Sequence, residues 1–299
     1  MKTFTSRAVL IAGILISGLY SCKKLAPLPA GPSSTSPTNT TNPITAKAQC
    51  DYDVNDTTYT NHGWTESFDE EFTGNLSNWS VNTGAVENEL EYYEAANAQV
   101  VNGALQLSVQ QQTVNGTSYN GKPQTFNFTS GSISGNQTFS ANSTTPKVMI
   151  EARIKVAGGY GVTSIFNAFG ANWPTNGQIN FLQVEGNNTT QYVTNYFYGT
   201  QAGQNLVQNA IYYNPTTEDL SACYHVYATE WTQNSLNYYL DGQLVQTQTG
   251  GGEIPGLFGK SEYLSLTLPI GGLYYQNLNA ANIQASTMYV DYVKVFTSN

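Results

Sequence analysis

Four side chains that can hydrogen-bond a polar ligand fall within one apolar stretch, Gly-Gln-Ile-Asn-Phe-Leu-Gln-Val-Glu. Gln178 and Asn180 share one face by the two-residue period of a strand, whereas Gln183 and Glu185 are out of phase with them. A one-residue bulge near Phe181 would turn all four polar side chains to the same face and the apolar ones to the other. The pattern therefore predicts either a polar row lining a cleft or a half-buried strand with one solvated face.

The composition is that of a β-rich protein whose acidic balance fits a neutral partner better than an anionic one. Of 299 residues only 10% are charged, and Gly, Tyr and other turn and strand formers are abundant. The formal net charge of −9 argues against a nucleic-acid partner, because such binding needs clustered Lys and Arg. The length suits one large domain or two small ones.

The N-terminus has the features of an export signal. Lys2 and Arg7 precede an apolar run that is too short to span a bilayer. The next residues, Leu-Tyr-Ser-Cys, resemble a bacterial lipobox ending at Cys22. We expect residues 1–21 to be a lipoprotein signal peptide and Cys22 to carry lipid, which predicts an exported, membrane-anchored protein at the outer membrane or cell surface. An ordinary signal peptide is the alternative.

Residues 22–49 are rich in Pro, Ser, Thr and Asn and predict an extended linker that cannot bury enough apolar surface to fold. The folded domain is expected over residues 50–299. Apart from Cys22 the chain has Cys50 and Cys223, which suit either a disulfide in an exported protein or two buried thiols.

Strand patterns follow one another through this domain. Val148, Ile150, Ala152 and Ile154 alternate with a mostly polar set, as in a strand with one face on a core. An Asp-Gly pair that begins at Asp241 lies between two alternating segments and predicts a hairpin turn. Many short strands with glycine-rich turns predict an all-β antiparallel sandwich or jelly roll.

A series of short motifs runs along the whole domain: residues 68–74 (FDEEFTG), Trp79, 88–93 (NELEYY), 102–105 (NGAL), 130–131 (SG), 151–155 (EARIK), 173–174 (WP), 225–232 (HVYATEWT), 241–242 (DG), 271–272 (GG) and 290–295 (VDYVKV). In their order these motifs resemble glycoside hydrolase family 16, the laminarinase, lichenase and agarase type of endo-glycanase. The resemblance implies a concanavalin A-like β-jelly roll of two curved antiparallel sheets, with a glycan cleft across the concave face.

The resemblance also gives the polar strand a meaning. The family's catalytic strand reads Glu-x-Asp-x-x-Glu with a bulge before its last residue, and the matching positions here are Gln178, Asn180 and Gln183. A retaining glycosidase needs two carboxyl groups about 5 to 5.5 Å apart, one as nucleophile and one as acid/base. An amide has no proton to give near neutral pH and is a poor nucleophile. It can still pair with sugar hydroxyls.

Further binding residues are expected from the same resemblance. Asn88, Trp173 and His225 match positions at the family's cleft, where Trp173 would stack on a sugar face and His225 would hydrogen-bond sugar or the catalytic strand. Core packing for the tryptophan and an ordinary sheet position for the histidine are the alternatives. The family's Trp-Pro-Ala-x-Trp segment is replaced by residues 162–166 (VTSIF), so two subsite tryptophans are missing.

Several carboxylates remain as alternatives. Glu185 is a candidate for a relocated acid. Glu87, Glu89 and Glu91 alternate, with a further glutamate following, and suit a solvated acidic edge better than a cleft or a cation site.

The resemblance implies one metal and no catalytic cofactor. A structural Ca²⁺ would be held by Glu71, Gly103 and Asp291, whose oxygen atoms suit that hard cation.

Three functions follow from these expectations. The favoured one is a non-catalytic, monomeric surface lipoprotein that binds a β-glucan-like polysaccharide. The second is an active endo-β-glycanase that uses Glu185 or another carboxylate. The third is a structural or adhesive protein without a sugar ligand.

Overall fold

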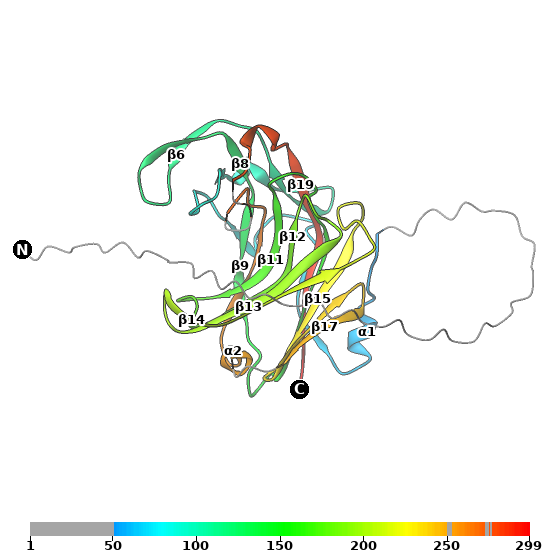
Figure 1. Cartoon of the computed structure of the whole chain (residues 1–299). Helices are drawn as coiled ribbons and strands as arrows, with labels where there is room; N and C mark the ends of the chain where they lie inside the picture. The colour runs from blue at the N-terminus through cyan, green and yellow to red at the C-terminus, as the bar shows by residue number, and fades with distance from the viewer. Residues whose placement is uncertain (1–50, 250–252, 273–274, 276) are drawn as a thin grey trace, which may run out of the picture. The chain divides into compact units, whose positions relative to one another are not determined.

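The computed structural model describes residues 51–249, 253–272, 275 and 277–299 (Figure 1). The predicted signal peptide, the linker, Cys22 and Cys50 lie outside these residues. Among the described residues, no helix is both long and apolar enough to cross a membrane.

The first sheet has eight strands in the order β17-β16-β15-β10-β19-β5-β4, with β1 also paired to β19. These strands are β1 (Thr65–Glu70), β4 (Ala98–Val101), β5 (Ala104–Val109), β10 (Lys147–Lys155), β15 (His225–Trp231), β16 (Ser235–Leu240), β17 (Gln243–Thr249) and β19 (Ser286–Ser298). Every pairing in it is antiparallel. The predicted Asp-Gly turn is confirmed, because Asp241 and Gly242 have positive φ and connect β16 to β17.

The second sheet has seven strands in the order β14-β13-β12-β11-β18-β9-β2, again all antiparallel. These strands are β2 (Trp79–Val81), β9 (Ser132–Phe139), β11 (Thr163–Gly170), β12 (Gln178–Glu185), β13 (Gln191–Gln201), β14 (Gln204–Pro215) and β18 (Glu262–Thr267). The polar stretch that opens the sequence analysis is β12, in the interior of this sheet.

Besides the two sheets, the described residues form two short strand pairs and four short helices. They are the parallel pair β3 (Glu91–Tyr93) and β8 (Phe128–Ser130), the hairpin β6 (Val114–Thr117) and β7 (Pro123–Phe126), the α-helices α1 (Thr57–Thr60) and α2 (Ile254–Leu257), and the 3₁₀ helices η1 (Ala95–Asn97) and η2 (Ala280–Asn282).

The hydrophobic core is formed by the apolar faces of strands from both sheets. Ile150, Ala152 and Ile154 of β10 belong to it, as the alternation predicted, together with Ile179 and Leu182 of β12. Burial of such side chains is the main stabilising term of a β-sandwich. The prediction of an all-β jelly-roll sandwich of antiparallel sheets is confirmed.

The first described residues run beside β15. The backbone N–H of Tyr52 donates to the Tyr224 carbonyl at 2.9 Å, and Tyr224 N–H donates to Asp51 Oδ1 at 3.1 Å. The neighbouring Cys223 is disulfide-bonded. The chain has three cysteines, and the other two, Cys22 and Cys50, lie outside the described residues. The Cys50–Cys223 bond stays a prediction.

Candidate ligand-binding cleft

A one-residue bulge in β12 brings three amide side chains to one face of the second sheet. Asn180 pairs with Asn195 of β13, and Gln183 pairs with Val193. Between these two pairs β12 advances by three residues and β13 by two, so β12 contains one extra residue. On the other side, β11 skips Phe181 in its pairing with β12. The predicted bulge is confirmed.

The bulge separates the two kinds of side chain. The apolar residues of β12, Ile179, Phe181, Leu182 and Val184, all lie in the core. Gln178, Asn180 and Gln183 line a cavity on the opposite face. The polar row therefore belongs to a cleft and not to a solvated strand face.

Cross-strand register extends this face across the sheet, because directly paired residues point to the same side. Asn180 pairs with Asn167 of β11, which pairs with Ser265 of β18 and through it with Ser134 of β9. Parallel rows run through Gln183, Ile165, Thr267 and Ser132 and through Gln178, Phe169 and Tyr263. The face is thus polar in its centre and aromatic along one edge.

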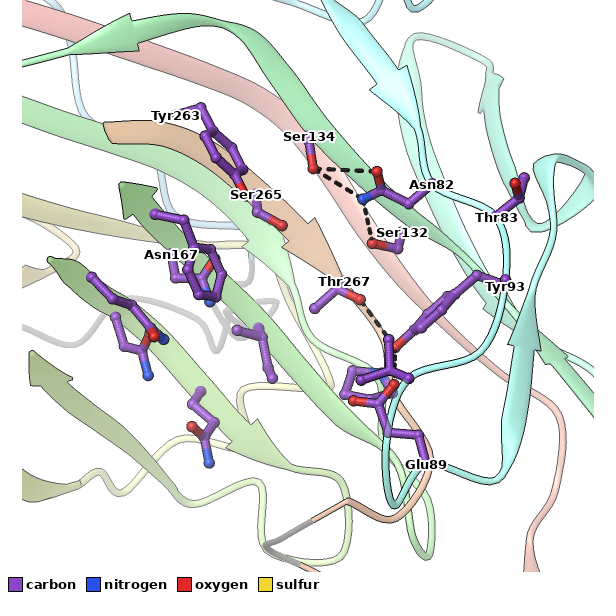
Figure 2. A pocket seen from close by; sticks show the side chains of 18 of the residues that line it. Asn82, Thr83, Glu89, Tyr93, Ser132, Ser134, Asn167, Tyr263, Ser265 and Thr267 are labelled. Carbon is purple, nitrogen blue, oxygen red and sulfur yellow. Dashed lines mark hydrogen bonds between the residues drawn. The ribbon is translucent and has the colours of Figure 1, made fainter. Parts of the chain in front are cut away.

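The cavity over these rows has a volume of about 430 Å³. Figure 2 shows Tyr263 toward one end of it and Glu89 with Tyr93 toward the other. It is lined by Asn82, Thr83, Gly84, Ala85, Val86, Glu89, Tyr93, Ser132, Ser134, Ile165, Asn167, Phe169, Gln178, Asn180, Gln183, Tyr263, Ser265, Thr267 and Pro269. The chemistry of these side chains is that of a site for a neutral, hydroxyl-rich ligand.

Hydrogen bonds between side chains orient part of the cleft. Trp173 Nε1 donates to Gln178 Oε1 at 2.9 Å, and Gln178 Nε2 donates to Asn180 Oδ1 at 2.6 Å. On the far wall, Asn82 Nδ2 donates to the hydroxyls of Ser132 and Ser134 at 2.9 and 3.0 Å (Figure 2). These groups are held in place before any ligand arrives.

Other amides in the cleft lack a protein partner. Both polar atoms of the Gln183 side chain and Oδ1 of Asn167 are buried without a hydrogen bond to protein, and Gln183 is only 1% exposed. Asn195, which pairs with Asn180 in the register, is likewise buried with an unpartnered side-chain amide. A buried polar group without a partner costs roughly 1–3 kcal/mol, so Gln183 and Asn167, which line the cleft, would be stabilised by a hydrogen-bonding ligand.

Glu89 and Glu91 form a carboxyl pair at the end of the cleft. Tyr93 Oη donates to Glu89 Oε2 at 2.9 Å, and the Ile270 backbone N–H donates to Glu91 Oε2 at 2.9 Å. Burial raises the pKa of Glu89, and burial followed by the charge of Glu89 raises the pKa of Glu91 well above its ordinary value. The predicted solvated acidic edge is wrong for these two residues, whereas Glu87 is exposed.

Of the other expected site residues, Trp173 contacts the cleft, whereas Asn88 and Glu185 do not line it. Trp173 is 41% exposed and reaches the cleft through Gln178, and its ring packs 6.0 Å from that of Phe197. Asn88 lines a neighbouring hollow instead of the cleft. Glu185 pairs with Thr163 at the end of β12 and is not among the residues that line the cleft. Burial raises its pKa.

The expected cleft position of His225 is wrong. This residue is fully buried on β15 of the first sheet, where its Nδ1 lies 2.8 Å from Asp241 Oδ2 and its ring stacks on Tyr52. Asp241 also accepts from the Val226 backbone N–H at 2.8 Å. His225 therefore fixes the β16–β17 turn to β15 and has no contact with the cleft.

Two residues of this face are not predicted from the sequence. Asn167 lies in the centre of the cleft, and Tyr213 of β14 shares its face, because Gln183 pairs with Val193 and Val193 pairs with Tyr213. Tyr213 is 64% exposed, so its ring is available to a ligand. The signal that could find both is the register: once β12 is placed, its partners on the neighbouring strands follow.

The expected Ca²⁺ ligands do not fit a metal site well. Glu71 Oε1 lies 3.0 Å from Lys294 Nζ, and Asp291 Oδ2 lies 2.5 Å from Arg153 Nη1. Gly103 is not among the residues of the pocket that contains both carboxylates. Within the described residues no group of three or more His, Cys, Asp and Glu side chains is arranged to hold a metal. Cationic side chains already neutralise these acids, so Ca²⁺ stays a prediction that the arrangement does not favour.

Comparisons with known proteins place this cleft in a family. The model for glycosyl hydrolases family 16 matches residues 87–265. The chain is 24% identical to the clotting factor G alpha subunit of Tachypleus tridentatus over 246 residues, covering 78% of this chain but only 34% of that protein. It is 36% identical to a beta-glucanase of Bacillus amyloliquefaciens over 118 residues, covering 38% of this chain and 44% of that one.

A solved structure agrees with these matches. The X-ray structure of endo-beta-1,3-glucanase from Pyrococcus furiosus superposes with a TM-score of 0.65 at 26% identity, covering 78% of this chain and 94% of that one. The family match spans more than half of the chain and includes β12 with its amide row. This chain belongs to glycosyl hydrolases family 16.

Proposed function

We propose that this domain binds a β-glucan-like polysaccharide in the amide-lined cleft without hydrolysing it. The observation that carries the proposal is the polar row of β12: Gln178, Asn180 and Gln183 lie together in the cleft, and Gln183 is buried with no protein partner. Sugar hydroxyls donate and accept hydrogen bonds and would supply what the amide lacks.

The absence of hydrolysis follows from the chemistry of these side chains. By the motif resemblance, Gln178, Asn180 and Gln183 stand at the family's nucleophile, assisting and acid/base positions. Loss of an acid/base residue alone costs a factor of about 10² to 10⁴ in rate, and loss of the nucleophile removes the covalent intermediate as well. Substitution of amides for carboxylates keeps the size and shape of the side chains, so it preserves binding while it removes catalysis.

The aromatic residues support a sugar as the ligand. Phe169 and Tyr263 line the cleft with ring centroids 6.1 Å apart, and Tyr213 is exposed on the same face. Flat apolar rings beside polar groups suit the faces and hydroxyls of a pyranose. The relatives named as beta-glucanase and endo-beta-1,3-glucanase make a β-linked glucan the first ligand to test.

The setting that fits this function is a cell surface. We propose that Cys22 carries lipid, that residues 22–49 hold the domain off the membrane, and that the domain acts as a monomer beside enzymes or importers that use the bound glycan. A Cys22→Ala protein should leave the membrane fraction, and one that stays there would contradict the anchor.

The test of binding combines a ligand panel with an activity assay. Affinity electrophoresis in gels containing β-1,3-glucan, mixed-linkage β-glucan or an unrelated polysaccharide should retard the wild-type protein in at least one of the β-glucan gels. Gln183→Ala should weaken that retardation, and Leu244→Ala, an exposed position on β17 of the first sheet, should not. Reducing-sugar release from the same glucans should stay at the level of a no-protein control. Free migration in every gel would contradict the proposal.

One observation favours a second candidate, an endo-glycanase with a displaced acid. Glu89 lines the cleft with a raised pKa and could protonate a leaving oxygen, whereas Glu185 does not line it. If wild-type protein releases reducing sugar and Glu89→Gln abolishes the release, this candidate replaces the first. If Glu185→Gln abolishes it instead, the acid lies at the end of β12.

A further inference from the structure

We propose that the β6–β7 hairpin and the segment before β3 form a second sugar subsite, which takes the continuation of the glucan chain bound in the amide-lined cleft. The inference rests on the proposed function and extends it to longer ligands. It gives a role to a hollow whose residues are distinct from the β12 row.

The hollow adjoins the cleft directly. It has a volume of about 320 Å³ and is lined by Ala85, Val86, Glu87, Asn88, Glu89, Ser118, Tyr119, Asn120, Gln124 and Phe126. Three of these residues, Ala85, Val86 and Glu89, also line the cleft. Because the two cavities share a wall and both are open, one linear polymer can lie in both.

The strand β3 places the hairpin at this junction. Successive residues of a strand point to opposite faces, and in β3 the side chains of Glu91 and Tyr93 are buried while Tyr92 between them meets the hairpin. The Tyr92 ring lies 5.2 Å from that of Phe126. A Cβ on Gly116 would lie 2.4 Å from the Tyr92 ring, so only glycine allows β6 to approach so closely.

The tip of the hairpin is a fixed platform. Ser118 N–H donates to the Lys122 carbonyl and Gly121 N–H to the Ser118 carbonyl, both at 2.8 Å, and Ser118 Oγ donates to Asn120 Oδ1 at 2.8 Å. These bonds hold the turn that carries Tyr119, whose side chain is 65% exposed. A large exposed ring on an ordered turn loses little entropy on binding and can stack on a sugar face.

The charges of the hollow select the class of glycan. The described residues that line it include two carboxylates, Glu87 and Glu89, and none of them is basic. An anionic polysaccharide, sulfated or rich in uronic acid, would meet like charge at the junction. The side-chain amide of Asn88 and the Nδ2 group of Asn120 can bind neutral hydroxyls. The ligand is therefore a neutral glucan chain that extends from the cleft over the hairpin.

Ligands of two lengths test the subsite by calorimetry. The probes are a β-1,3-linked glucose trimer, which the cleft alone can hold, and the heptamer, which reaches both cavities. Tyr119→Ala should weaken heptamer binding about fivefold to tenfold and leave trimer binding unchanged. Tyr119→Phe keeps the ring and should behave as wild type. Gln183→Ala should weaken both probes.

The outcomes separate this inference from the proposed function. If wild type binds both probes with equal affinity, or if Tyr119→Ala binds the heptamer as tightly as wild type does, the second subsite is wrong and the cleft remains. An equal loss for trimer and heptamer in Tyr119→Ala would also contradict a subsite that serves long chains. If wild type binds neither probe nor any β-glucan, both the subsite and the proposed function are wrong.

Discussion

Trp173 Nε1 donates to Gln178 Oε1 at 2.9 Å, and this single bond fixes which end of the Gln178 amide faces Asn180. With its oxygen held by the indole, Gln178 must present Nε2 to Asn180 Oδ1, at 2.6 Å. The donors of Asn180 and both polar atoms of Gln183 are then the parts of the row that a ligand can use. An exposed tryptophan outside the lining of the cleft thus sets the hydrogen-bonding pattern within it.

Trp173→Phe should therefore weaken glucan binding although it keeps an aromatic ring. Removal of one donor that orients a binding residue is expected to cost about 1 kcal/mol, roughly a fivefold loss of affinity. Calorimetry with a β-1,3-glucan oligomer measures this. In a double-mutant cycle with Gln178→Ala the two losses should not add, because both changes break the same bond. Fully additive losses would show that the indole acts independently of Gln178.

The triple variant Gln178→Glu, Asn180→Asp, Gln183→Glu should gain hydrolysis of the glucan that the wild type binds. The change restores carboxylates to a bulged strand whose geometry already places them on one face. Reducing-sugar release and product analysis measure the gain. The single variant Gln178→Glu is the matched control and should stay inactive, since one carboxylate cannot supply both roles. A folded triple variant that binds glucan without cleaving it would contradict a preserved active-site geometry.

Glu151→Gln should flatten the pH dependence of stability. Glu151 is buried on β10, where it accepts from Tyr59 and from Tyr292, and burial raises its pKa to about 7 from 4.5. Between these values the folded state holds a proton that the unfolded state has lost, so stability falls as pH rises through this window, by roughly 3 kcal/mol. Urea unfolding at pH 5 and pH 8 should show this fall in the wild type and a smaller one in the variant. Other buried carboxyls contribute equally to both proteins, so identical falls would contradict the assignment.

Lys294→Met should lower stability and create sensitivity to calcium. The Lys294 ammonium lies 3.0 Å from both Asp56 Oδ2 and Glu71 Oε1, and because both carboxylates are partly exposed its loss should cost about 1 kcal/mol. Added Ca²⁺ should then raise the melting temperature of the variant, whereas chelator and Ca²⁺ should leave the wild type unchanged. Lys147→Met, an exposed lysine of β10, is the control. A wild-type melting temperature that falls in chelator would instead support Ca²⁺ at Glu71 and Asp291.

The sequence predicts the β fold and the polar strand β12 because both depend on the alternation of polar and apolar residues. Asn180 and Gln183 are three residues apart, so a regular strand would place them on opposite faces. A bulge between them keeps both side chains out of the core, and the structure contains this bulge. The expected cleft position of His225 comes from the family resemblance, and alternation along its strand cannot correct it. Alternation shows that a strand has a buried face, but it does not show whether that face is the interior of the sandwich or a concave cleft.

The errors at Glu89 and Glu91 have another cause. A run of alternating glutamates suggests solvent, since an isolated buried charge is costly, and only the tertiary contacts with Tyr93 and the Ile270 backbone make burial tolerable. The sequence does not predict Tyr213, because this residue shares the face of Gln183 only through two successive strand pairings. Such positions depend on register between strands that are distant in sequence.

The extra residue at Phe181 has a consequence for how this strand can change over time. A carboxylate and an amide can replace one another at Gln178 or Gln183 without disturbing the pleat. Loss or gain of a single residue between Asn180 and Gln183 would instead exchange the two faces of everything beyond it, and place Gln183 in the core and Val184 over the ligand. The spacing of the polar residues is therefore constrained more tightly than their chemistry. A binding protein and an enzyme can share one strand length and differ only in the atoms at the ends of its side chains.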